Sequence, residues 1–216
     1  QRLKAEEQVL LESDKPLVTW GFHHYFHGKL SRQDLDKISM TRPILVIHRS
    51  FHEFILNSSA LAFFGITQEL VNNFDEEAKE YASFEKGHFS EQGMVSILPY
   101  LMKYLAAPDR LIKGLQTTEK YLHNNGVTLV ANPGAYSLKP VQDAKNFVFG
   151  DEETPFRSFY IPSGLLLAEQ YPADELVEKS KEFLSWGKGK VEYLPLQIKL
   201  FTDGAMYSQN MVMRDG

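Results

Sequence analysis

The sequence contains no cysteine, so disulfide bonds, zinc ribbons and catalysis by a thiol are excluded. It also lacks any apolar run near the roughly 18–20 residues that span a bilayer, and its first residues are polar, unlike a signal peptide. The absence of cysteine does not distinguish a reducing from an oxidising compartment. We expect no membrane association, and a cytoplasmic location is our expectation.

Dense clusters of basic residues are missing as well. The 23 basic and 28 acidic residues are scattered and give a net charge of -5. A nucleic-acid ligand would need a basic block to displace counterions from its phosphates, so we expect no nucleic-acid partner. With 43% hydrophobic and 24% charged residues, the composition is typical of a globular protein. We find neither an internal repeat nor a flexible linker.

Apolar runs that favour strands alternate with segments that favour helices. The strand-like runs are RPILVIHRSF from Arg42, VTLVANPG from Val127, RSFYIP from Arg157 and LQIKLF from Leu196. The helix-like segments cover residues 2–12, 57–65, 109–126 and 171–187. The first two runs are typical of buried strands, and Asn-Pro-Gly at the end of the second indicates a turn. This alternation predicts an α/β fold with a parallel sheet, either doubly wound or part of a (β/α) barrel.

Lys199 lies in the middle of the last apolar run. Strand alternation places it on the same face as Asp203, provided that the strand continues that far. A lysine inside such a strand is costly to desolvate unless it is paired or its pKa falls. Three roles stay open: an ion pair with Asp203, a base or Schiff-base nucleophile as in an aldolase-type barrel, and a carbamate that ligates divalent metals.

Polar side chains follow the first apolar strand, at the strand end where barrel enzymes place functional residues. His52 either hydrogen-bonds a substrate or is a partly buried histidine bonded to the backbone. Arg49 either grips a carboxylate or forms an exposed ion pair. Glu91, in the segment GHFSEQG, is a candidate ligand or base, and a solvated glutamate is the alternative.

Three histidines gather in the segment WGFHHYFHG, which covers Trp20 to Gly28. His23 and His27 have the i, i+4 spacing of a helical metal pair, and His24 adds another nitrogen. The segment lacks the glutamate that follows the first histidine in a metalloprotease helix. We therefore favour a loop whose aromatic side chains shape a pocket over a metal site.

Taken together, several segments resemble the formamide-deformylase-like branch of the amidohydrolase superfamily, amidohydrolase family 3. RPILVIHRSFHEFILNSSALAFFGI is similar to the branch's Arg-Pro, apolar strand, Asp-Gly-His, Asn-Ser-x-Ala-Leu and Gly-Ile pattern. GHFSEQG is similar to its Gly-x-Leu-x-Glu, GVTLVANPG to its Gly-Val-Thr strand, and IKLFTDGAMYS to its Lys-hydrophobic-Phe-x-Asp-Gly-Ala strand. The segments follow the family's order and cover most of residues 30–210.

The resemblance implies a metal-dependent hydrolase on a (β/α)₈ TIM barrel, with a small β-sandwich formed from both chain ends. Residues 1–216 would then be an internal fragment, the central and incomplete part of the barrel domain with roughly strands 2 to 4, and inactive alone. One or two divalent ions, with zinc expected, would be bound by Lys199 as a carbamate. His52, Asn57 and Asp203 would contact a small amide-type substrate, whose C–N bond a metal-activated hydroxide would attack.

The sequence departs from the family pattern at Ser50-Phe51, where the family has Asp-Gly, and in the histidine-rich segment. We expect these departures to change the range of substrates. A homodimer is a further expectation. The alternative function is a binding or scaffold barrel that has lost its metal site, and the absence of a His-x-His motif before residue 1 would favour it.

Overall fold

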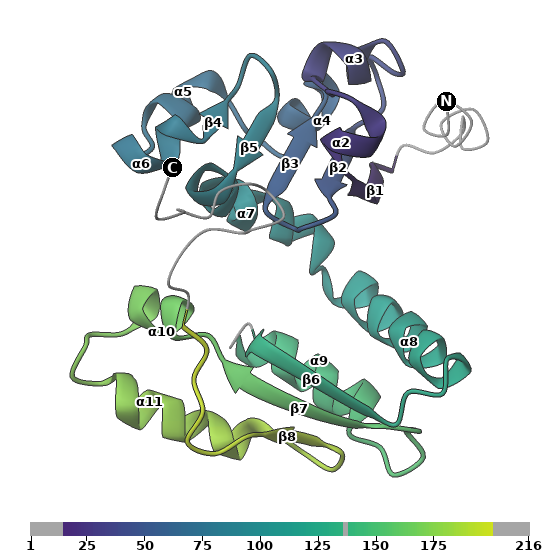
Figure 1. Cartoon of the computed structure of the whole chain (residues 1–216), viewed down its shortest axis with the longest axis vertical. Helices are drawn as coiled ribbons and strands as arrows, with labels where there is room; N and C mark the ends of the chain where they lie inside the picture. The colour runs from purple at the N-terminus through teal and green to yellow at the C-terminus, as the bar shows by residue number, and fades with distance from the viewer. Residues whose placement is uncertain (1–14, 136–137, 201–216) are drawn as a thin grey trace. The chain divides into compact units, whose positions relative to one another are not determined.

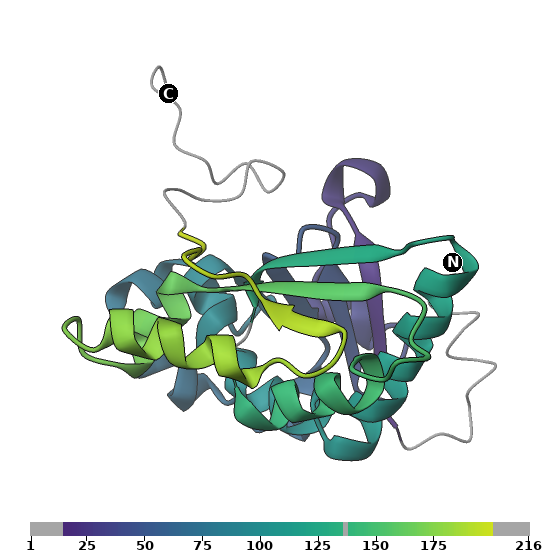
Figure 2. The same cartoon turned by 90° about the horizontal axis from the view of Figure 1, so that it is seen from below.

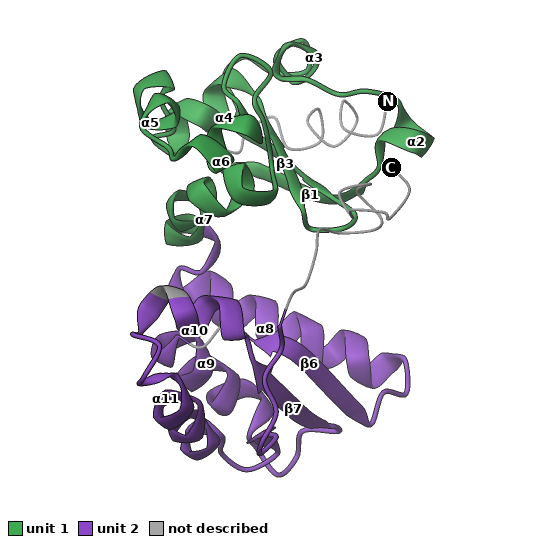
Figure 3. Cartoon of the chain, turned by 60° about the vertical axis from the view of Figure 1, so that its left-hand side comes forward, with its two compact units in different colours: residues 1–104, 203–216 green, residues 105–202 purple. Residues whose placement is uncertain are grey.

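The computed structural model describes residues 15–135 and 138–200. The predicted helix at residues 2–12 and the predicted site residue Asp203 lie outside the described residues. The chain divides into two compact units, unit 1 with residues 1–104 and 203–216 and unit 2 with residues 105–202 (Figure 3). The prediction that residues 1–216 belong to one incomplete barrel domain stays a prediction. Within the described residues, no helix combines the length and apolar character that crossing a membrane requires.

Unit 1 is built on a five-stranded sheet with the strand order β1-β2-β3-β5-β4 (Figure 1). Its strands are β1 (Leu17–Phe22), β2 (Ile44–His48), β3 (Glu53–Leu56), β4 (Ala82–Ser83) and β5 (His88–Ser90). Its helices are α2 (His24–His27), α3 (Arg32–Asp36), α4 (Ser58–Phe63), α5 (Gln68–Asn72), α6 (Glu76–Glu80) and α7 (Glu91–Leu105). β1 and β2 are parallel, whereas the remaining pairings of this sheet are antiparallel.

β2 forms the centre of the unit 1 core because it is apolar on both faces. Ile44, Leu45 and Val46 are each at most 2% exposed, which confirms the prediction of a strand buried on both faces. The helix predicted after it is also confirmed. α4 follows Asn57, whose side chain caps it, and ends just before Gly65, which has a φ of 70°.

Unit 2 contains a parallel three-stranded sheet with the order β6-β7-β8. Its strands are β6 (Leu129–Ala135), β7 (Arg157–Pro162) and β8 (Val191–Tyr193). Its helices are α8 (Pro108–Asn124), α9 (Lys139–Phe149), α10 (Gly164–Gln170), α11 (Leu176–Glu182) and the 3₁₀ helix η1 (Phe183–Trp186). Strands alternate with helices, so the predicted α/β class with a parallel sheet is confirmed for this unit.

The helices of unit 2 pack on one face of its sheet (Figure 2). On that face Tyr160, Val191 and Tyr193 are buried together with Phe149 of α9 and Phe183 of η1. A barrel wall also carries its helices on a single face. The parallel strands of unit 2 are consistent with a piece of such a wall, and the (β/α)₈ architecture itself stays a prediction.

β6 differs from its sequence prediction in two respects. The strand forms, but most of its residues are exposed, because β6 is the edge strand of the described sheet. The predicted turn at 132–134 is wrong, since the strand continues to Ala135. Pro133 is tolerated on an edge strand, and Gly134, with a φ of 90°, absorbs the shift in register there.

The predicted strand LQIKLF is only partly correct. β8 lies before it, and within the described residues the segment itself contributes one parallel bridge, between Lys199 and Ser163. The chain from Tyr193 to Lys199 is longer than the stretch of β7 that it accompanies. The extra residues bulge outward, and Leu196, with a φ of 58°, is fully exposed. Lys199 still lies beside the carboxyl end of β7.

Candidate functional site

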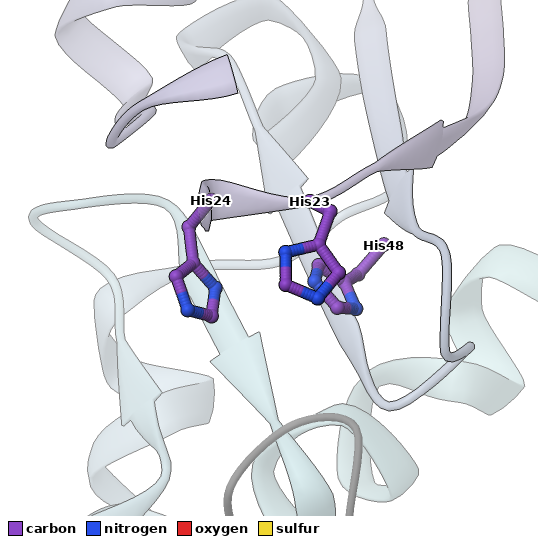
Figure 4. Close-up of side chains that lie close together, drawn as sticks. All are labelled: His23, His24 and His48. Atoms are coloured by element: carbon purple, nitrogen blue, oxygen red, sulfur yellow. The ribbon is translucent and has the colours of Figure 1, made fainter. Parts of the chain in front are cut away.

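The carboxyl ends of β1 and β2 bring three histidines together (Figure 4). The two strands are parallel, and Phe22, the last residue of β1, is in register with His48, the last residue of β2. Parallel neighbours end at the same edge of a sheet, so the residues that follow β1 must lie beside His48. These residues are His23, which caps α2, and His24, which begins it.

The three imidazole rings lie close enough to bind one ion. Their ring centroids are 4.8 Å apart for His23 and His48 and 6.0 Å apart for His24 and His48. One ring nitrogen of each residue lies within 4.8 Å of the others. His48 is completely buried, whereas His23 and His24 are half-buried. His27, grouped with them in the sequence, is outside the cluster and bonds through Nδ1 to the backbone of His23.

A half-buried carboxylate, that of Glu53, lies next to this cluster. Glu53 accepts a hydrogen bond from His88 Nε2 at 2.9 Å, and its other oxygen is 3.8 Å from His48 Nε2. Burial raises the pKa of Glu53, but the hydrogen bond from His88 and the charge of His48 outweigh burial and hold that pKa below its usual value. Burial lowers the pKa of His48, against the opposing effect of Glu53. The hydrogen bond from His88 and the neighbouring histidines therefore favour an ionised Glu53 carboxylate beside the cluster.

His52, the predicted substrate-binding residue, is held by Glu91. His52 Nδ1 lies 3.0 and 3.1 Å from the two carboxylate oxygens of Glu91, which begins α7. The exposed fractions of the two side chains are 33% and 20%, so the pair is accessible from solvent. A carboxylate that fixes one ring nitrogen of a histidine leaves the other nitrogen oriented for a ligand. Sequence reasoning named both residues without pairing them.

Asn57, another predicted substrate-binding residue, is fully buried, and its side chain forms hydrogen bonds with backbone groups. Its side-chain oxygen accepts hydrogen bonds from the N–H groups of Ile44 and Ala60, at 2.9 and 2.8 Å. Its amide nitrogen donates to the carbonyls of Ser39 and Arg42, at 2.8 and 2.9 Å. These four bonds use the full capacity of the amide. A contact between Asn57 and substrate stays a prediction, and it would require one of these bonds to open.

Lys199, the predicted metal ligand, belongs to unit 2, whereas the histidine cluster and His52 belong to unit 1. Its side chain is half-buried. The backbone on each side of the bridge is fixed, because Lys199 N–H donates to Pro162 and the Lys199 carbonyl accepts from Gly164 N–H. Asp203, its predicted neighbour, lies outside the described residues.

No family model and no curated protein matches the chain, so the family-level resemblance stays a prediction. Two crystal structures that are similar in fold are of uncharacterized metal-dependent hydrolases. The one from Pyrococcus horikoshii OT3 is 15% identical, with a TM-score of 0.59 over 95% of this chain and 38% of that chain. The one from Pyrococcus furiosus is 17% identical, with a TM-score of 0.55 over 94% of this chain and 39% of that chain. The chain thus spans about two fifths of each hydrolase and shares its fold over that part.

Proposed function

We propose that this chain is part of a metal-dependent hydrolase that cleaves the C–N bond of amides, formamides or cyclic amides. The observation that carries the proposal is the likeness in fold, over 94–95% of the chain, to two proteins named as metal-dependent hydrolases. The family-like segments of the sequence support the C–N bond as the target. The activity belongs to the whole protein, because the matched part is 38–39% of each hydrolase.

We propose zinc as the metal and Lys199, as a carbamate, as its ligand in this chain. Bound metal would supply a hydroxide nucleophile and polarise the carbonyl oxygen of the substrate. Lys199 fits this role by position, because the parallel bridge to Ser163 fixes its backbone beside the carboxyl end of β7. Functional residues of parallel α/β folds gather at this end of the strands.

His52 is the proposed substrate contact with the most favourable geometry. Glu91 fixes one nitrogen of its ring, and a third of its side chain is exposed. The oriented ring would hydrogen-bond the carbonyl or the leaving nitrogen of a small amide.

Replacing Lys199 tests the proposed ligand. Metal content and hydrolysis of a panel of amides, formamides and cyclic ureas would be measured on the intact protein that contains this chain. Lys199→Ala should lose metal and lower hydrolysis by at least about 100-fold, because a ligand contributes more than the residues that support it. Lys188→Ala is the matched control, since Lys188 is exposed in the same unit.

Two outcomes would contradict the proposal, one for the carbamate and one for the hydrolase activity. Equal metal content and equal hydrolysis in Lys199→Ala and wild type would exclude the carbamate. A metal-free intact protein that hydrolyses none of the panel would contradict the hydrolase and favour the binding or scaffold barrel.

A further inference from the structure

We propose that His23, His24 and His48 of unit 1 form a binding site for one divalent transition metal of the zinc type. The proposal rests on unit 1 alone and does not depend on the hydrolase function. Three ligand nitrogens from two parallel strand ends lie within 4.8 Å of one another.

The proposed ligand atom of His48 is a buried nitrogen, on a ring whose centroid lies 4.8 Å from that of His23 and 6.0 Å from that of His24. Among the described residues, His48 Nε2 is inaccessible to water and has no hydrogen-bond partner. Glu53, at 3.8 Å, is beyond hydrogen-bond distance. A buried polar atom without a partner costs roughly 1–3 kcal/mol. A metal ion at this position would satisfy that nitrogen.

The other nitrogen of His48 has the support that metal-binding histidines show. His48 Nδ1 lies 2.7 Å from the hydroxyl oxygen of Ser50 and 3.2 Å from the backbone nitrogen of Ser50. In the tautomer in which Nδ1–H donates to the hydroxyl oxygen, the lone pair of the ring is on Nε2, and the Ser50 N–H loses Nδ1 as an acceptor. A hydrogen bond from the remote N–H fixes the tautomer and the ring orientation of metal ligands. Glu53 adds a negative charge beside the site, which favours a cation.

The ligand type selects the class of metal. Imidazole nitrogens suit zinc, copper, nickel and cobalt, whereas magnesium and calcium take oxygen ligands. Zinc–nitrogen bonds of about 2.0–2.1 Å require the ligand nitrogens to approach to roughly 3.4 Å. His23 and His24 are half-buried, so their side chains have room to turn inward. Three histidines leave a fourth position open to water or an exogenous ligand.

Metal binding by His23 has a local consequence that can be measured. His23 Nδ1 accepts the N–H of Tyr25 at 3.1 Å and so caps α2. Coordination through Nδ1 uses that lone pair, and coordination through Nε2 places the proton on Nδ1. Either mode removes the acceptor of the Tyr25 N–H. The amide of Tyr25 should therefore exchange its hydrogen faster when metal is bound.

A titration of the whole chain with zinc chloride, in which calorimetry measures the binding, tests the site. We expect one zinc ion per chain, no binding of magnesium chloride at the same concentrations, and at least 10-fold weaker zinc binding in both His24→Ala and His48→Ala. His123→Ala is the control and should bind zinc as the wild type does, because His123 is an exposed histidine of α8. His24→Ala gives a decisive result even if His48→Ala fails to fold, since His24 is half-buried.

Three results would overturn the site: no zinc binding by the wild type, unchanged affinity in His24→Ala, or equal weakening in His123→Ala. Hydrogen exchange of the Tyr25 amide, measured with and without zinc, gives an independent readout. Unchanged exchange at saturating zinc would exclude His23 as a ligand. Because these measurements record binding and not hydrolysis, failure of this site and failure of the proposed function are distinguishable.

Discussion

Asn57 joins the start of α4 to the segment that leads into β2, and its replacement is predicted to destabilise the protein strongly. The side chain bonds the approach to β2, the first residue of β2 and the first turn of α4. Asn57→Ala would remove all four of these hydrogen bonds to buried backbone groups. We expect the free energy of unfolding, measured in urea, to fall by about 3–5 kcal/mol.

Thr67 provides the matched comparison for Asn57. It caps α5 with one hydrogen bond, to Leu70 N–H, and is exposed. Thr67→Ala should cost only about 1 kcal/mol. Similar losses in the two variants would mean that the bonds of Asn57 to the approach and start of β2 contribute nothing.

Phe51 illustrates what a single residue reveals only in the fold. The family pattern has glycine at this position, and Phe51 does adopt a φ of 63°, which glycine normally occupies. The side chain is 56% exposed and stacks on Trp20, with ring centroids 5.6 Å apart. Trp20 is distant in sequence, so no local signal indicates this pairing.

Only part of the histidine cluster could be recognised in the sequence. His23 and His24 were recognised with His27, because helical spacing is a local pattern. His48 joins them through the register of two parallel strands, which the sequence does not specify. The signal that could have found it is a pair of apolar strands with histidine at the end of one and directly after the end of the other. His52 and Glu91 were likewise named separately, and only the fold pairs them.

At the scale of elements, the contact between α9 and β7 makes the free energy of unfolding vary with pH in the alkaline range. Lys145 of α9 is 8% exposed and its ammonium lies 4.3 Å from the ring centroid of Tyr160. Burial lowers the pKa of Lys145 to about 8. Between that value and the unfolded pKa of about 10.4, the unfolded chain binds more protons than the folded one. The free energy of unfolding should therefore rise with pH in this window.

The rise should be roughly 1–2 kcal/mol between about pH 8 and 9.5, measured by urea unfolding. At higher pH the effect is opposed, because burial raises the pKa of Tyr160 and folding then disfavours its ionisation. Lys145→Met should abolish the rise, whereas Lys188→Met, at an exposed position, should keep it. A rise of the same size in Lys145→Met would show that Lys145 is not its source.

Elements with strong local signals could be predicted, and those set by their neighbours could not. β2, α4 and α8 were recognised from apolar runs, caps and helical periodicity. β3 and β8 are short strands whose pairing depends on partners already in place. The exposure of β6 depends on its edge position, because the same apolar residues would be buried if both neighbours were present.

At the scale of the molecule, the division into two units cannot be recognised from the amino-acid composition along the chain. The first boundary lies between Tyr104 and Leu105, at the last residue of α7, and α8 begins soon after it at Pro108. Helix-forming residues flank it on both sides, and no run rich in glycine or serine marks a linker. The α/β class followed from alternation along the chain, whereas the division into units depends on which contacts form.

Metal removal and return in the intact protein that contains this chain tests the central claim most directly. Hydrolysis of the amide, formamide and cyclic urea panel would be followed before chelation, after chelation and after addition of zinc. We predict that chelation abolishes C–N bond hydrolysis and that zinc restores it, because the metal supplies both the nucleophile and the polarisation of the carbonyl. Hydrolysis that survives complete removal of metal would contradict the account.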